Sequence, residues 1–125
     1  MFKIIYCMRR KPGITREQFL AHWLSVHGPI VVEHQSRLRI ARYLQTTPLE
    51  DEFSTRVERR GVLQPAYDGV AELYWASDAD FRHAFTDSEA LRILDGWFQA
   101  DGDFCQIHIA TFAHQGSLES RKKGK

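Results

Sequence analysis

The order in which the hydrophobic pattern changes along the chain limits its fold more than any other feature. Short apolar runs rich in β-branched and aromatic residues predict strands at residues 2–9, 39–46, 67–75 and 104–112. Apolar residues spaced three and four apart predict helices after Thr15, from Ser77 or Asp78 to Phe85, and again from Asp87 or Ser88. The order strand, helix, strand, strand, helix, strand predicts a ferredoxin-like βαββαβ α+β fold, an antiparallel sheet with helices on one face.

The first helix contains a Gly28-Pro29 pair within its apolar stripe. Thr15 is expected to be its N-cap, with Gln18 as the partner in a capping box. Proline lacks a backbone donor and clashes with the preceding turn, so the pair is expected to break or bend the helix. A second helical piece should follow, with Pro29 in its first turn.

Length and composition indicate one domain with a single core. The chain has 125 residues, a hydrophobic fraction of 43% and a formal net charge of +1, which predicts no nucleic-acid partner. Its apolar runs are too short to cross a membrane, and it begins without a signal-peptide pattern, so a cytoplasmic location is expected. The domain should cover residues 1–114, with a long excursion at 48–66 and a basic tail at 115–125 that we expect to be flexible.

The predicted strands are apolar on both faces, which a sheet covered by helices on one side cannot leave in water. Ile4 and Tyr6 would lie on one face of the first strand, and Ile5 and Cys7 on the other. An exposed patch of that kind exceeds what monomers usually tolerate. We therefore predict a homodimer in which the two sheets pack face to face. Glu72, a lone carboxylate in the third strand, is expected to pair with an arginine such as Arg39 or Arg42 at that seam.

A series of motifs covers most of the chain up to about Phe112. They are Arg10-Lys-Pro-Gly13, Phe19 with His22-Trp23 and His27-Gly-Pro29, Arg42-Tyr-Leu-Gln45, Tyr67-Asp-Gly-Val-Ala-Glu-Leu-Tyr-Trp75 and Ser77-Asp78. In this order the sequence resembles the EthD-like family of the dimeric α+β barrel superfamily. The resemblance implies a ferredoxin-like fold, a dimer formed by the sheets, and a small-molecule pocket between helices and sheet. It says less about chemistry, because monooxygenases, isomerases, cyclases, dehydratases and haem enzymes share this scaffold.

Three histidines, His22, His27 and His34, lie around the Gly-Pro pair. Their spacing does not bring two imidazoles together on one helix face, and no third ligand is near, so no metal site is expected. His22 falls off the apolar stripe and should lie at the surface, whereas His34 reads as a packed or capping residue. His27 lies in the stripe at a helix end, where the macrodipole favours the imidazolium and burial disfavours it, a competition suited to a proton shuttle. It could instead satisfy backbone carbonyls; the resemblance favours the pocket.

Two further polar residues are candidates for catalysis. Tyr43 offers a phenol that could hold or protonate a substrate oxygen, although a core tyrosine bonded to the backbone is equally consistent with the pattern. His108 interrupts an apolar strand and would face either the pocket or the partner's sheet. The expected substrate-binding walls could equally be core; they are Phe19, Trp23, Leu73, Trp75 and Trp97.

No motif in the sequence indicates a cofactor. The chain has no Gly-rich phosphate loop, no GxSxG elbow, no CxxC pair and no haem-attachment motif, so none is expected. With the resemblance, this predicts a cofactor-independent enzyme using acid/base chemistry (dehydration, isomerisation or cyclisation) on a hydrophobic aromatic, polyketide-like or lactone metabolite. His27 would be the general acid or base, Tyr43 would position a substrate oxygen, and His108 would be a second proton-transfer group. The alternative is a non-catalytic binding or accessory protein that holds such a metabolite.

Overall fold

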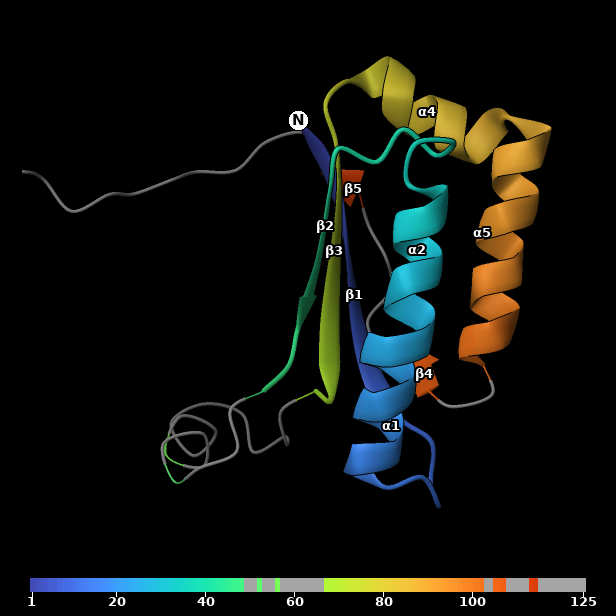
Figure 1. The fold of residues 1–125 in the computed structure, drawn as a ribbon. Coiled ribbons are helices and arrows are strands. Elements are labelled where there is room, and N and C mark those ends of the chain that lie inside the picture. Colours follow the sequence, from blue (N-terminus) through green and yellow to red (C-terminus); the bar gives the residue numbers. More distant parts are fainter. Residues whose placement is uncertain (49–51, 53–55, 57–66, 103–104, 108–112, 115–125) are drawn as a thin grey trace, which may run out of the picture.

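The order of helices and strands confirms the predicted ferredoxin-like α+β plan (Figure 1). The computed structural model describes residues 1–48, 52, 56, 67–102, 105–107 and 113–114. The elements are β1 (Phe2–Arg10), α1 (Arg16–His22), η1 (Trp23–His27), α2 (Gly28–His34), β2 (Arg42–Thr46), β3 (Gly69–Trp75), α4 (Asp78–Thr86), α5 (Ser88–Asp101), β4 (Cys105–Ile107) and β5 (Ala113–His114). The predicted tail at 115–125 and almost all of the excursion at 48–66 lie outside the described residues.

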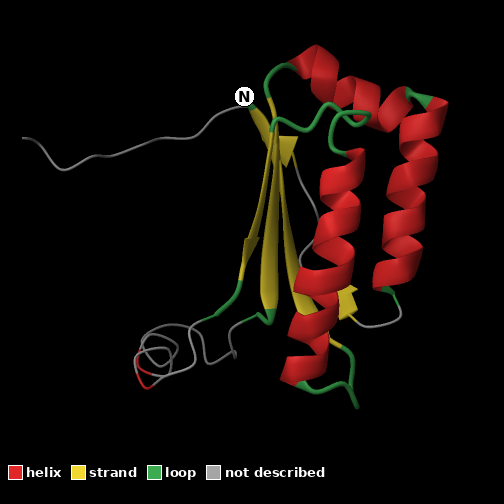
Figure 2. Ribbon diagram, viewed as in Figure 1, coloured by secondary structure: helices red, strands yellow, loops and turns green. Residues whose placement is uncertain are grey.

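The sheet is antiparallel with β1 at its centre, and its strand order is β2-β3-β1-β4. β1 pairs with β3 from Phe2 opposite Trp75 to Met8 opposite Gly69. β4 pairs with the far end of β1, and β5 pairs with β1 near its beginning. Figure 2 shows all the described long helices on one side of this sheet, so the other side is left without a helical cover.

The second strand begins later than the sequence predicted. The apolar pattern placed its start at residue 39, whereas β2 begins at Arg42. Arg39 instead has a left-handed backbone conformation with φ of 55°, and its N–H donates to the carbonyl of Ser36. Arg39 therefore belongs to the turn that ends the helix, and Ala41, whose N–H donates to the carbonyl of Tyr74, leads into the strand. An apolar pattern alone cannot distinguish such a connection from a strand end.

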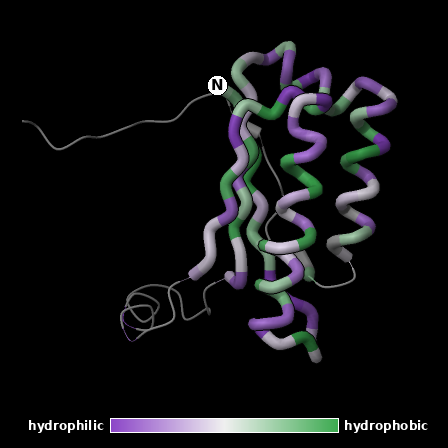
Figure 3. The backbone as a smooth tube through the Cα atoms, in the orientation of Figure 1, coloured by the Kyte–Doolittle hydropathy of each residue, from purple (hydrophilic) through white to green (hydrophobic). Residues whose placement is uncertain are grey.

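The core forms where the helix-facing sides of β1 and β3 meet the helices. Hydrophobic residues occur along the strands and along the helices (Figure 3), and in β1 and β3 burial alternates so that the helix-facing set is buried. Trp75 is fully buried and donates its indole N–H to the carbonyl of Leu38 at 2.8 Å, which satisfies the one polar atom of that ring. The strand side of the core comprises Ile4, Tyr6, Met8, Ala71, Leu73 and Trp75.

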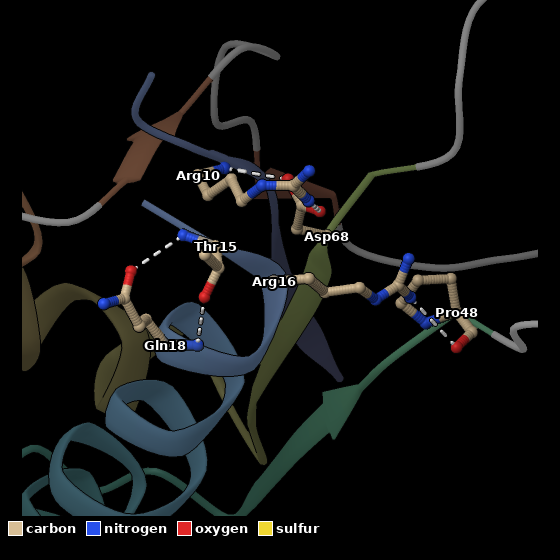
Figure 4. A network of polar contacts seen from close by, with 6 residues as sticks. All are labelled: Arg10, Thr15, Arg16, Gln18, Pro48 and Asp68. Atoms are coloured by element: carbon tan, nitrogen blue, oxygen red, sulfur yellow. Dashed lines mark hydrogen bonds and ion pairs between the residues drawn. The ribbon is translucent and has the colours of Figure 1, made fainter. Parts of the chain in front are cut away.

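The start of the first helix has the capping box that the sequence predicted (Figure 4). The hydroxyl of Thr15 accepts a hydrogen bond from the N–H of Gln18 at 3.1 Å. The amide oxygen of Gln18 in turn accepts from the N–H of Thr15 at 2.9 Å. Two backbone donors that the helix leaves unpaired are satisfied in this way, and the starting point of α1 is fixed.

A buried carboxylate joins the end of β1 to the beginning of β3. Asp68 is 8% exposed and accepts two hydrogen bonds from Arg10, one from its backbone N–H at 2.8 Å and one from its guanidinium at 2.5 Å. The N–H of Asp68 donates to the carbonyl of Met8. Nearby, the Arg16 guanidinium donates to the carbonyl of Pro48 and so links α1 to the residues after β2 (Figure 4).

The helix does not end at Gly28-Pro29. It widens into the π-helical segment η1 and continues directly as α2. Gly28 has right-handed helical angles, φ −54° and ψ −51°, and donates its N–H to the carbonyl of Trp23, five residues back. Because a π-turn already interrupts the i→i−4 ladder, the missing N–H of Pro29 costs less at this point than in a regular helix.

The π-turn determines which residues the helix presents to the core. Phe19, Trp23, His27 and Val31 are each four residues apart, and all are buried. In a regular α-helix each four-residue step advances the side chain by about 40° beyond a full turn, giving about 120° over the three steps. The extra residue held in η1 removes about 100° of this drift. His27 and Val31 consequently stay on the face that Phe19 begins.

The sheet face without helices carries an apolar centre flanked by charged residues. The carboxylate of Glu72 lies 3.9 Å from the ammonium of Lys3 and accepts a hydrogen bond from the hydroxyl of Tyr74. The expected arginine partners of Glu72 bind elsewhere within the subunit, since Arg39 pairs with Asp80 and Arg42 stacks on the Tyr74 ring. By strand register the half-buried apolar residues of this face are Ile5, Cys7, Leu44 and Val70.

Two further properties of the described residues are the state of the Cys7 thiol and the length of the helices. Burial raises the pKa of the Cys7 thiol, which favours the protonated, less reactive form at neutral pH. Within the described ranges, none of the helices combines the length and the hydropathy needed to cross a bilayer.

Close packing between β3 and the first helix predicts that Gly69→Ala will destabilise the protein. A Cβ at Gly69 would lie 2.7 Å from Cζ3 of Trp23, whose ring is fully buried. The substitution should lower the free energy of unfolding by about 1–3 kcal/mol, the usual cost of overpacking a core. Urea unfolding followed by circular dichroism measures this change.

Gly96→Ala is the matched control. A Cβ at Gly96, in α5, would have no heavy atom within 4 Å, so the substitution should raise the free energy of unfolding by about 0.5–1 kcal/mol through helix propensity. Equal effects of the two substitutions would contradict the close contact between Gly69 and Trp23.

Candidate functional site

A small, partly enclosed cavity of about 40 Å³ lies between the sheet and the helices. Its walls come from both layers, so it forms only when the helices pack on the sheet. The described lining contains one imidazole and two phenol side chains, and the rest of it is hydrocarbon and indole. The lining residues are Tyr6 of β1, His27 of η1, Val31 of α2, Tyr43 of β2, Leu73 of β3, and Leu94 and Trp97 of α5.

His27 is the last residue of η1 and is 8% exposed. Its ring meets the edge of the Trp97 indole, with centroids 6.4 Å apart and planes at 75°. The π-turn directs His27 inward, and α5 closes over it. The structure therefore places this histidine in the cavity lining, the position that the resemblance implied.

The other two histidines of this region lie outside the cavity lining. His34 is half-buried on α2 and packs against the same indole, its centroid 6.4 Å from that of Trp97. This agrees with its interpretation as a packed residue. His22 is half-buried on α1 rather than fully at the surface. In the described part of the chain no three His, Cys, Asp or Glu side chains gather as a metal site would require.

The two tyrosines reach the cavity from different strands of the sheet. Tyr43 lies opposite Leu73 in the β2–β3 pairing, and both line the cavity. Tyr6, on β1, pairs with Ala71 and is 8% exposed. Sequence reasoning did not single out Tyr6 as functional. The signal available was a phenol between two apolar residues on the buried face of a strand, where the hydroxyl needs a polar neighbour or a cavity.

The aromatic walls expected from the sequence divide between cavity and core. Leu73 and Trp97 line the cavity. Phe19, Trp23 and Trp75 are 0% exposed and lie outside the cavity lining, packed within the core. Helical or strand spacing identifies a buried face but not which part of that face borders a space. His108, the third catalytic candidate, lies outside the described residues.

Gln45 joins the two sides of the cavity. Its side-chain N–H donates to the carbonyl of Trp23 at 2.9 Å, so this carbonyl accepts from both Gln45 and Gly28. Glycine at position 28 leaves room for this side chain, because a Cβ there would lie 2.7 Å from the amide oxygen of Gln45, which would have to shift. The link fixes η1, which carries His27, against β2, which carries Tyr43.

This arrangement suits proton transfer in an apolar setting. The described lining contains no carboxylate, ammonium or guanidinium group, and its residues with a titratable or hydroxyl-bearing side chain are His27, Tyr6 and Tyr43. An imidazole can accept or donate a proton, and a phenol can donate a hydrogen bond to a developing oxyanion. Apolar walls keep bulk water from competing for these bonds.

Comparison with known proteins places the fold among solved structures. HapK from Hahella chejuensis is 16% identical with a TM-score of 0.56, covering 99% of this chain and all of its own. An ethyl tert-butyl ether D (EthD) family protein from Bacillus halodurans C-125 is 10% identical with a TM-score of 0.58, over 94% of this chain and all of its own. An EthD-like protein from Ralstonia eutropha JMP134 is 16% identical with a TM-score of 0.56, over 95% of this chain and 94% of its own. At these identities the likeness extends to the fold alone.

Sequence comparison gives the family. Among curated proteins, none is significantly similar to this chain. The sequence model of the EthD domain matches residues 11–101. This range includes all of the described cavity-lining residues except Tyr6. Since this match covers most of the chain and agrees with the fold, the protein belongs to the EthD family.

Proposed function

We propose that the protein is a small enzyme that carries out acid/base chemistry, without a cofactor, on a hydrophobic metabolite. The observation that carries the proposal is the convergence of His27, Tyr6 and Tyr43 on one small, otherwise apolar cavity. Family membership is consistent with this but does not select a reaction. The substrate class proposed is an aromatic, polyketide-like or lactone compound with a carbonyl group.

The proposed chemistry begins with removal of a proton from carbon. The imidazole of His27 would take a proton from the carbon next to a carbonyl, and a tyrosine hydroxyl would donate a hydrogen bond to the carbonyl oxygen as it gains negative charge. Return of the proton to a different carbon gives isomerisation. If a β-hydroxyl leaves and takes the proton from His27, water is released and the reaction is a dehydration. If the carbanion attacks a second carbonyl of the substrate and the resulting alkoxide takes that proton, a ring closes.

Replacing the cavity histidine should remove proton transfer. We predict that His27→Gln lowers catalysed deuterium uptake from D₂O into an enolisable aromatic ketone, with 2-tetralone as the first probe, by about 10²–10⁴-fold. Glutamine has a similar volume and can still form hydrogen bonds, but its amide cannot act as a general acid or base near neutral pH. Loss of the ketone's α-proton signals in ¹H NMR measures the rate.

His34→Gln is the matched control, because His34 contacts the same Trp97 ring from the same helical rod but does not line the cavity. It should leave deuterium uptake unchanged, and thermal unfolding should show both variants folded. Uptake unaffected by His27→Gln would remove His27 from the mechanism. Binding of the ketone to the wild-type protein without catalysed uptake would instead favour a non-catalytic binding protein.

We also propose that the protein is a homodimer in which the two helix-free sheet faces pack together. The half-buried apolar centre of this face supports the proposal, because strands exposed on one side normally alternate with polar residues there. The flanking charges, including Lys3 and Glu72, suit the polar rim of such an interface. In a two-fold symmetric dimer, the apolar centre of one subunit would pack against the same apolar centre of the other subunit.

A charge introduced at the centre of this face should separate the subunits. Wild-type protein at micromolar concentration should sediment at twice the chain mass, and Val70→Lys should shift it to the monomer by burying an unpaired ammonium. Val26→Lys, an exposed valine on η1, should leave the dimer intact. A wild-type monomer at micromolar concentration would exclude this interface.

A further inference from the structure

The inner cavity is too small for the ring system of the proposed substrate. Its volume of about 40 Å³ accommodates one or two water molecules or a single oxygen-bearing group. A benzene ring occupies an engineered protein cavity of about 150 Å³. If the proposed function is correct, most of the substrate must therefore lie outside the cavity while its reactive group is inside.

A larger groove of uncharged lining shares Tyr43 with the cavity. It has a volume of about 590 Å³, is open to solvent, and runs between the η1–α2 junction and the edge strand β2. Its volume falls in the range of small-molecule sites, about 300–1,000 Å³. The described lining carries no charged side chain and consists of Leu24, Gly28, Pro29, Val32, Tyr43 and Gln45.

Tyr43 lines both the groove and the cavity, so it forms the boundary between them. Gly28 and Gln45, which are held against each other beneath the groove, form part of its floor. Two apolar side chains of its lining are well exposed, Leu24 at 44% and Val32 at 58%. A ligand lying here would remain next to a tyrosine that also lines the cavity with His27.

We infer that this groove binds the apolar body of the substrate, while one oxygen-bearing arm extends past Tyr43 to His27. The inference rests on the proposed function and narrows the substrate class. The expected molecule is uncharged, with a flat ring system and a single carbonyl or hydroxyl group at one end. The groove's neutral lining provides no partner for a carboxylate, phosphate or ammonium group on the body of the ligand.

The helix provides a pair of groove residues and a matched pair outside the groove. Leu24 and Val32 line the groove; Ile30 and Val26, on the same helical rod, are 38% and 46% exposed and lie outside its lining. We compare the double variant Leu24→Ser/Val32→Ser with the control Val26→Ser/Ile30→Ser. Both remove exposed branched side chains from η1 and α2, so general effects on the helix should be similar.

The probe is 2-naphthol, a fused-ring compound with one hydroxyl, and its Kd is measured by isothermal titration calorimetry. The groove variant should weaken binding by about 10-fold, the effect expected from losing partial burial of two apolar side chains against the ligand. The control should bind like the wild type. Equal weakening by both pairs, or by neither, would overturn the inference. A change of sedimenting mass in the groove variant alone would assign the groove to a second copy of the chain and would also overturn it.

Methyl NMR locates the probe independently of affinity. Intermolecular NOEs from the naphthol ring protons to the methyl groups of Leu24 and Val32 are expected. NOEs confined to the cavity residues Val31 and Leu94 would place the ring inside and contradict the inference.

The variant His27→Gln separates this inference from the proposed function. It should abolish catalysed deuterium uptake yet leave the naphthol ring bound in the groove with the same NOEs. If uptake survives this substitution while the groove pair behaves as expected, the catalytic proposal fails and the groove assignment remains. If uptake is lost but the groove pair has no effect on binding, the groove assignment fails and the catalytic proposal remains.

Discussion

The carbonyl oxygen of Trp23 accepts two hydrogen bonds, and the geometry of the candidate site depends on this pair. Gly28 donates from five residues ahead and so creates the π-turn, while Gln45 donates from the edge strand. The absence of a side chain at Gly28 lets the two donors approach the same oxygen. One oxygen atom therefore sets both the rotation of the helix that directs His27 inward and the distance of that helix from the strand that carries Tyr43.

The site combines a small cavity with a larger open groove. The cavity has room for a functional group, and its described lining offers an imidazole and two tyrosines but no charged group. The groove beside it offers exposed apolar side chains together with the polar side chains of Tyr43 and Gln45. Binding energy gained on the body of a ligand in such a groove can hold a reactive group at a precise position in the cavity, which lowers the entropic cost of reaction. The sheet face opposite is separate from this site, so dimerisation there would leave it accessible.

Much of the fold could be predicted because it depends on local periodicity. The strand and helix order, the Thr15 capping box and the burial of alternate residues in β1 and β3 follow from spacing and cap chemistry. The structure differs from the prediction where packing in three dimensions decides, as at the second strand, which begins at Arg42 rather than at residue 39. At Gly28-Pro29, where a break or bend was predicted, the irregularity is a π-turn, and the predicted second helical piece follows with Pro29 in its first turn. Within the subunit Glu72 lies beside Lys3 and Tyr74, and its pairing with an arginine at a dimer seam stays a prediction.

The sequence by itself determined the family, the ferredoxin-like plan and the candidacy of His27 and Tyr43, because motif order and hydrophobic spacing are properties of the chain alone. Only the tertiary structure decided that Tyr6 lines the cavity and that Phe19, Trp23 and Trp75 are core. The boundary between a filled and an empty part of a buried face depends on how side chains from different elements interlock. That depends on packing in three dimensions, which a one-dimensional pattern does not contain.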